Sequence, residues 1–199
     1  SFNPNATERV LLCSHWDSRP WADQDTKDRD KPILAANDGA GGVGVLIELA
    51  NAIKKSPTNI GVDIFFIDAE DYGYSSSLAG LVKIKGETDN SFCLGSQHWA
   101  QHPHVPGYKA SFGILLDMAV ASDAVFTREG TSQYNASWVQ DLVWNNAAKL
   151  GYSSLFSSQS TAPITDDHLY INQIAKIPTV DIIHYDATTP SGFAKYWHT

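Results

Sequence analysis

Two adjacent acids, Glu70 and Asp71, follow the apolar run 64–67, and this arrangement carries a cost. Carboxylates repel each other at close range, and each one loses hydration when it is buried. A bound cation, or a reaction that uses one acid as a base, would offset that cost. Zinc accepts carboxylate and imidazole ligands, so one of the two neighbours can bind zinc while the other stays free as a base.

Further acids and histidines follow other apolar segments of the chain. Any single one is more simply explained as a helix cap, a turn former or an ordinary polar side chain. Their coincidence at several segment ends is not required by separate capping roles, and it indicates one shared site. The residues are His15, Asp17, Asp38, Asp117, Asp166, Asp167, His168, His184 and His198.

Hydrophobic patterns predict the elements that would position these side chains. Short apolar runs predict buried strands, and apolar residues that recur every three to four positions predict helices. The expected strands are 9–14, 62–67, 112–116 and 179–183, and the expected helices are 43–55, 139–150 and 167–174. Loops are expected at 20–31 and 153–161, and a surface excursion at 75–90.

This order of strands and helices predicts an α/β fold. We expect a three-layer sandwich in which a central, mixed but mostly parallel sheet has helices on both faces. In open sheets of this kind, ligands bind outside the carboxyl ends of the strands, where several of the acids and histidines fall. A length of 199 residues suits a single domain over residues 1–199.

Composition excludes some classes of partner. The formal net charge is −8 and no run of Lys and Arg is present, so we expect no nucleic-acid partner. No apolar stretch is long enough to span a bilayer. Cys13 and Cys93 are too few for a disulfide framework or for a thiolate zinc cluster.

Seven motifs carry a family resemblance. They occur in the order "HWDSRPWADQD", "ILAANDGAGGVGVLIELA", "FFIDAEDYG", "CLGSQHWA", "GILLDM", "ITDDHLYIN" and "YWHT". Together they resemble the bacterial, Bacteroidetes-type glutaminyl-peptide cyclotransferases of the zinc aminopeptidase-like clan, from Arg9 to the last residue. The resemblance implies a zinc exopeptidase-like fold, an exported enzyme of the periplasm or cell surface, and a chain cropped at both ends.

The resemblance also implies an activity and a metal site. The enzyme would be an acyltransferase that converts the N-terminal Gln of peptides or proteins to pyroglutamate and releases ammonia. One zinc ion would be held by Asp38, Asp71 and His198, and the peptide bond between Asp38 and Gly39 would be cis. Glu70 would be the general acid and base.

Other positions are carried over from the same family. Asp117 and Asp166 match an acidic hydrogen-bond network near the zinc. Trp197, Phe193 and Thr165 match residues of the substrate pocket. Asp181 stands where the animal members have a network histidine, so an animal-type network is not expected here.

A zinc aminopeptidase is the alternative function. Enzymes of the same clan use these Asp, Glu and His positions with two metals and a bridging hydroxide. His15 and Asp117 stand where ligands of the second metal would be, so ligand content alone does not separate the two activities. A binding module that kept only the fold is disfavoured, because the ligand-type residues and the base are all present.

Overall fold

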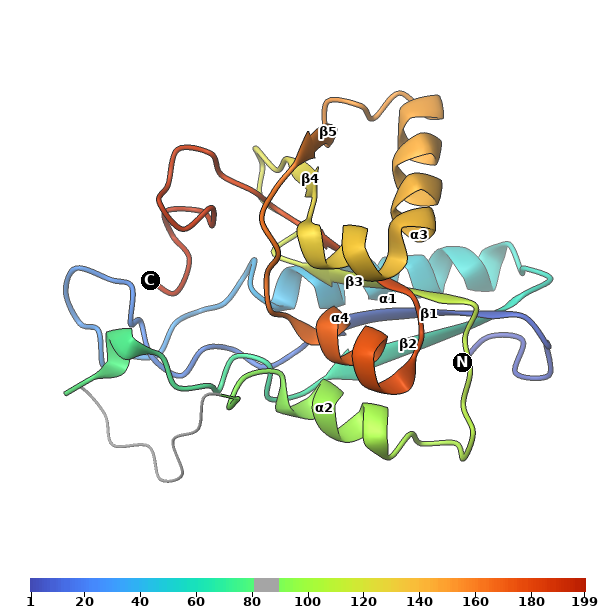
Figure 1. Cartoon of the computed structure of the whole chain (residues 1–199), viewed down its shortest axis with the longest axis horizontal. Helices are drawn as coiled ribbons and strands as arrows, with labels where there is room; N and C mark the ends of the chain where they lie inside the picture. Colours follow the sequence, from blue (N-terminus) through green and yellow to red (C-terminus); the bar gives the residue numbers. More distant parts are fainter. Residues whose placement is uncertain (81–89) are drawn as a thin grey trace.

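A parallel sheet of four strands forms the centre of the computed structural model, which describes residues 1–80 and 90–199. The strands are β1 (Arg9–His15), β2 (Gly61–Ile67), β3 (Phe112–Asp117) and β6 (Thr179–Ile183), in the order β2-β1-β3-β6 (Figure 1). His15 pairs with Ile67, and Asp117 pairs with Ile183. The carboxyl ends of these parallel strands therefore lie side by side, and the residues that follow them leave the sheet at the same end.

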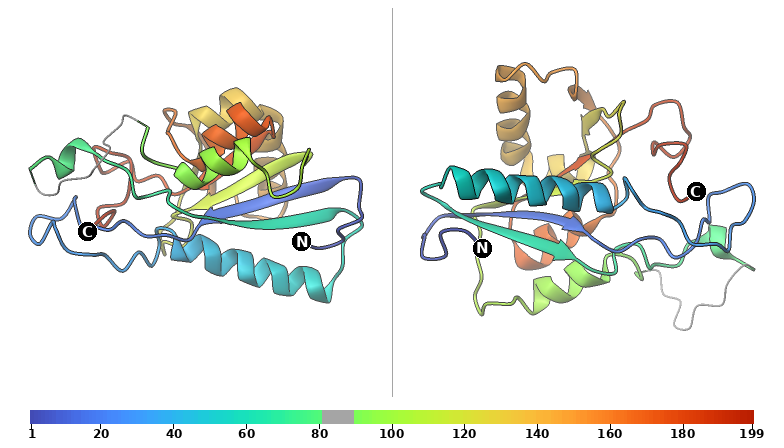
Figure 2. Two further views of the ribbon diagram at one scale, coloured as in Figure 1. Left: turned by 90° about the horizontal axis from the view of Figure 1, so that it is seen from below. Right: turned by 180° about the vertical axis from the view of Figure 1, so that it is seen from behind.

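Helices cover both faces of this sheet. Helix α1 (Ala40–Lys55) lies on one face, and α2 (Leu94–Gln101) and α4 (Asp167–Tyr170) lie on the other (Figure 2). Helix α3 (Gly130–Lys149) packs against β6. The predicted α/β class, with a parallel sheet between helices, is confirmed. None of the helices in the described ranges has the length and apolar character needed to cross a membrane.

The core lies in two layers because successive strand residues face opposite sides of the sheet. Leu115 packs with Ile67 and Trp99 on the α2 side. Leu116, the next residue, packs with Leu46 and Trp144 on the α1 side. Burial on both sides holds the strand ends in place, and these ends carry the candidate site.

Several elements differ from the predicted ones. Residues 153–161 are not all loop, because β5 (Phe156–Ser160) pairs with β4 (Phe126–Arg128) in a small parallel sheet. Strand β5 reads FSSQS and is mostly exposed, so it lacks the apolar signal of a strand. Helix α2 and strand β4 were not predicted either, and both are short.

The observed ends of two helices differ from the predicted ends. Helix α3 begins nine residues before the predicted helix. Its first turns are polar, so the apolar pattern did not reveal them. The side chain of Glu129 caps the helix by accepting from the backbone N–H groups of Thr131 and Ser132. The predicted helix 167–174 is α4 followed by a π-helical turn, η2 (Ile171–Ala175). Within the expected excursion 75–90, one 3₁₀ turn, η1 (Ser76–Leu78), is present, and residues 81–89 lie outside the described residues.

Candidate metal and catalytic site

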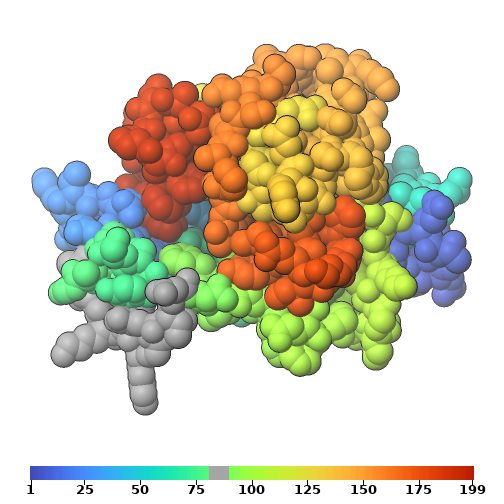
Figure 3. Space-filling view, viewed as in Figure 1, coloured from blue at the N-terminus to red at the C-terminus, as the bar shows by residue number. Residues whose placement is uncertain are grey.

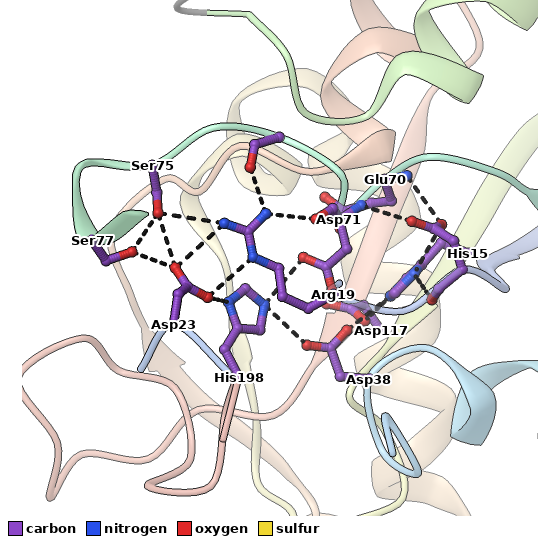
Figure 4. A network of polar contacts seen from close by, with 12 residues as sticks. His15, Arg19, Asp23, Asp38, Glu70, Asp71, Ser75, Ser77, Asp117 and His198 are labelled. Carbon is purple, nitrogen blue, oxygen red and sulfur yellow. Dashed lines mark hydrogen bonds and ion pairs between the residues drawn. The ribbon is translucent and has the colours of Figure 1, made fainter. Parts of the chain in front are cut away.

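Three ligand-type side chains converge from separate parts of the chain (Figure 4). Asp38 precedes α1, Asp71 follows β2, and His198 lies near the end of the chain. The Nε2 atom of His198 is 3.1 Å from Asp71 Oδ1 and 3.5 Å from Asp38 Oδ2, and all three residues are buried. The peptide bond between Asp38 and Gly39 is cis, as the resemblance predicted.

This trio fits a zinc ion. Asp71 Oδ2 and both ring nitrogens of His198 are buried and make no hydrogen bond within the part of the chain that the structure describes, although ion-pair contacts surround the ring. Buried polar atoms almost always have a partner, and an ion is one reason for an exception. Two carboxylates and one imidazole, with one position open, match the ligand set of catalytic zinc. The role of the three residues as ligands stays a prediction.

The carboxylates around His198 set its charge. Burial alone would lower its pKa, but contacts with Asp23, Asp38 and Asp71 raise the pKa of His198 to about 10. Burial raises the pKa of Asp71. These carboxylates favour the protonated imidazole, so a metal that binds at Nε2 would displace a proton there.

Glu70 and Asp71 are adjacent in sequence, yet they face different partners. The backbone N–H groups of Glu70 and Asp71 each donate to the carboxylate of Asp17, at 3.0 Å. Asp71 then points to His198, whereas Glu70 points to the thiol of Cys93, at 3.1 Å. Burial, and then repulsion from Asp71, raises the pKa of Glu70 well above its ordinary value.

A second group lies beside the first and contains His15 and Asp117. His15 Nε2 is 3.0 Å from Asp38 Oδ1 and 3.1 Å from Asp117 Oδ1. Burial and the nearby Asp38 raise the pKa of Asp117 to about 7. Burial would lower the pKa of His15, but hydrogen bonds to Asp117, Asp17 and Asp38 raise it well above its ordinary value. Asp38 thus faces both histidines with its two oxygens.

One pocket collects the nine side chains that the family resemblance assigned to the site. The predicted members that line it are Asp38, Glu70, Asp71, Asp117, Thr165, Asp166, Phe193, Trp197 and His198. Four apolar residues that were not predicted, Phe92, Met118, Ile164 and Ile183, complete the wall. Phe92, Met118 and Ile164 directly precede or follow Cys93, Asp117 and Thr165 in the sequence, which is the signal that could have found them, whereas Ile183 offers no such signal.

Aromatic rings form one side of this pocket. The rings of Phe193 and Trp197 lie 4.6 Å apart, centre to centre, and Trp197 lies 4.0 Å from the ring of His198. The segment that carries them gathers with the loop after β1 and the segment after β2 at one end of the molecule (Figure 3). An aromatic wall of two tilted rings therefore stands directly beside the candidate metal position.

Asp166 lies near Glu70, whereas two of the candidate histidines contact residues outside the pocket. Asp166 caps α4, and one of its oxygens is within 4.8 Å of ligand atoms of Glu70 and Cys93. His168 Nε2 is 3.1 Å from Glu129 Oε2, and His168 does not line the pocket. His184 accepts from the backbone of Val125 at 2.9 Å and does not line the pocket.

Sequence reasoning missed two charged residues behind the site, Arg19 and Asp23. Both are 1% exposed. The segment 20–31 is polar and unpatterned, so it was predicted as a plain loop. Its position directly after a strand that ends at the site was the one available hint.

Comparisons with known proteins agree with this geometry. The whole chain, residues 1–199, matches the sequence profile of Peptidase family M28. Tannerella forsythia glutaminyl cyclase is 48% identical with a TM-score of 0.92, and the match covers 100% of this chain and 67% of that one. A Zn-dependent exopeptidase from Parabacteroides distasonis is 44% identical with a TM-score of 0.92, and the match covers 100% of this chain and 66% of that one. No curated protein matches the chain.

An aminopeptidase is also among the similar structures. A leucine aminopeptidase precursor from Bacteroides thetaiotaomicron is 44% identical with a TM-score of 0.90, and the match covers 100% of this chain and 65% of that one. The chain therefore spans about two thirds of the length of the structures that it matches. The resemblance to bacterial glutaminyl cyclases is confirmed. Both the sequence profile and the solved structures place this chain in Peptidase family M28.

Proposed function

We propose that the protein is a zinc-dependent glutaminyl-peptide cyclotransferase that converts the N-terminal Gln of peptides or proteins to pyroglutamate. One observation carries this proposal: a single pocket combines three ligand-type side chains, a separate carboxylate and an aromatic wall. Glu70 accepts from the thiol of Cys93 and is not a member of the Asp38, Asp71 and His198 trio, which supports its role in moving protons. The names of similar glutaminyl cyclases support the same activity.

The proposed reaction is an intramolecular acyl transfer. One zinc ion, held by Asp38, Asp71 and His198, would supply Lewis acidity at the side-chain amide carbonyl of the substrate Gln. Glu70 takes a proton from the α-amine as its nitrogen bonds to the amide carbon, and returns it to the amide nitrogen, which leaves as ammonia. No water is consumed. The aromatic wall of Phe193 and Trp197 holds the Gln side chain folded toward its own amine.

The remaining pocket residues support these steps. Asp117 and Asp166 would hold the acidic hydrogen-bond network near Glu70, and exposed Thr165 would contact the substrate at the rim. Peptides and proteins with N-terminal Gln are the proposed partners. The resemblance also supports export to the periplasm or the cell surface.

A zinc aminopeptidase remains the second candidate, and one observation favours it. Ligand atoms of His15, Asp38 and Asp117 lie within 4.8 Å of one another, next to the first trio. Asp38 would then bridge two metals, as in a di-metal exopeptidase. The leucine aminopeptidase precursor among the similar structures is in line with this activity.

Two peptides that differ only in their first residue separate these candidates. A cyclotransferase releases ammonia from the Gln-initiated peptide, blocks its amino terminus and leaves the Leu-initiated peptide unchanged. An aminopeptidase releases free Leu and shortens the peptide. Ammonia release, amine labelling and mass spectrometry of both peptides provide the measurement. Free amino acid without ammonia would reject the cyclotransferase.

A further inference from the structure

A buried ion pair, Arg19 with Asp23, lies directly behind the candidate metal ligands (Figure 4). Arg19 Nε donates to Asp23 Oδ1 at 3.1 Å, and Nη2 donates to Asp23 Oδ2 at 3.3 Å. The hydroxyl groups of Ser75 and Ser77 also donate to Asp23 Oδ2. Burying a charged pair costs hydration, so a pair with this many partners indicates a positional role as well as stability.

The carboxylate of this pair reaches His198. Asp23 Oδ1 is 3.3 Å from His198 Nδ1, the ring nitrogen opposite the one that faces Asp38 and Asp71. The next residue, Gln24, donates its backbone N–H to the carbonyl of His198 at 3.1 Å. His198 itself has a φ of +55°, in a segment without helix or strand. Its orientation therefore depends on these contacts with the loop after β1.

The guanidinium of the same pair reaches Asp71. Arg19 Nη1 donates to the carbonyl of Asp71 at 2.6 Å and to the carbonyl of Gly73 at 2.5 Å. The planar fork of Arg can hold a carboxylate on one side and two carbonyls on the other, which the single ammonium of Lys does not reproduce. One side chain thus joins the segment after β2 to Asp23, and through Asp23 to the end of the chain.

We propose that Arg19 and Asp23 are positioning residues that hold His198 and Asp71 in ligating geometry before a metal arrives. The inference rests on the proposed metal site, but it does not depend on which reaction that site performs. Asp23 fixes the imidazole so that Nε2, not Nδ1, faces the metal position.

Zinc affinity is the readout, measured by competition with a chromophoric chelator and independent of any peptide. Asp23→Asn weakens zinc binding by about 10–100-fold, the usual effect of losing an outer partner of a ligating histidine. A matched control is Asp63→Asn. Asp63 pairs with Arg9 in the same two-pronged way, at 2.6 and 3.2 Å, but at the amino-terminal end of β1 and β2. That variant keeps the zinc affinity of the wild type.

Asp23→Asn leaves the charge of Arg19 buried without its partner, and this could prevent folding. A second variant therefore tests the same proposal. Arg19→Met with Asp23→Leu removes both charges together, a replacement that buried pairs often tolerate. It also weakens zinc binding about 10–100-fold. Circular dichroism of the metal-free variants checks folding. A zinc affinity within twofold of the wild type in either folded variant overturns the proposal.

A third measurement needs no variant. If the pair organises the site in advance, the amide of Gln24 is protected from hydrogen exchange in the metal-free wild type. Exchange as fast as in an unfolded chain overturns the proposal. Failure of the proposed function is separate: a wild type that binds zinc but cyclises no Gln-initiated peptide rejects the cyclotransferase and leaves the role of Arg19 and Asp23 standing.

Discussion

The thiol of Cys93 lies 3.1 Å from Glu70 Oε1, so the residue that precedes α2 contacts the proposed base directly. The backbone supports this contact, because Cys93 donates its N–H to the carbonyl of Glu70, and Leu94 donates to Ala69, each at 2.9 Å. Burial, and then the charge of Glu70, raises the pKa of Cys93. The thiol therefore stays protonated and donates to the carboxylate.

Removal of this donor should slow the reaction. Cys93→Ala lowers kcat about tenfold, equivalent to about 1.4 kcal/mol and within the range of one hydrogen bond. Cys93→Ser keeps a donor and retains most of the activity. Cys13→Ala is the matched control, because Cys13 is also buried but contacts the carbonyl of Ile114 instead of the site. Steady-state rates of ammonia release give the comparison, and equal losses in the Ala and Ser variants of Cys93 would contradict it.

Substitutions of Glu70 and Asp71 should have different effects on turnover and on zinc content. Glu70→Gln keeps the shape of the side chain but is not a competent base, so turnover falls by about 10²–10⁴-fold while zinc content is unchanged. Asp71→Ala loses zinc, because one of three protein ligands is gone. Metal analysis of both purified variants, together with their rates, tests the assignment. Equal zinc loss in the two variants would mean that the roles are reversed.

Chelation should abolish activity, and the amount of zinc that restores it identifies the reaction class. A cyclotransferase recovers ammonia release at one zinc per chain. Titration of the metal-free protein, followed by both rate and bound metal, measures this number. A requirement for two zinc ions would point to His15 and Asp117 as further ligands and to the aminopeptidase.

Acid should weaken the contribution of Asp63 to stability. Burial would raise its pKa, but contacts with Arg9, Ser1 and Tyr108 lower the pKa of Asp63 from 3.8 to about 2. A carboxyl group whose pKa is lower in the folded than in the unfolded protein stabilises the fold when the pH is above its unfolded-state pKa. This stabilisation is lost as the pH falls through the folded-state pKa. Asp63→Asn should therefore be less stable than the wild type at neutral pH, with the difference shrinking between about pH 4 and 2. Urea unfolding of the metal-free proteins over this range measures it, and a constant difference would refute it.

Sequence patterns predicted the strands of the central sheet, and the family resemblance named nine side chains that line one pocket. Strands β1, β2, β3 and β6 are largely buried, so each contains a short apolar run that can be recognised without knowledge of its neighbours. The acids and histidines that follow these runs could be assigned to one edge, because parallel strands end together. Local motifs carried the rest of the site, and its nine predicted side chains line one pocket.

Only the tertiary structure decided which groups stand behind that pocket. Strand β5 escaped prediction because its partner β4, and not its own polar sequence, makes it a strand. Arg19 and Asp23 escaped because their meaning lies in contacts with Asp71 and His198, which are distant along the chain. A charged residue in a loop looks solvated from the sequence. Whether such a residue is buried depends on which distant segments of the chain pack over it, and the local sequence pattern does not contain that information.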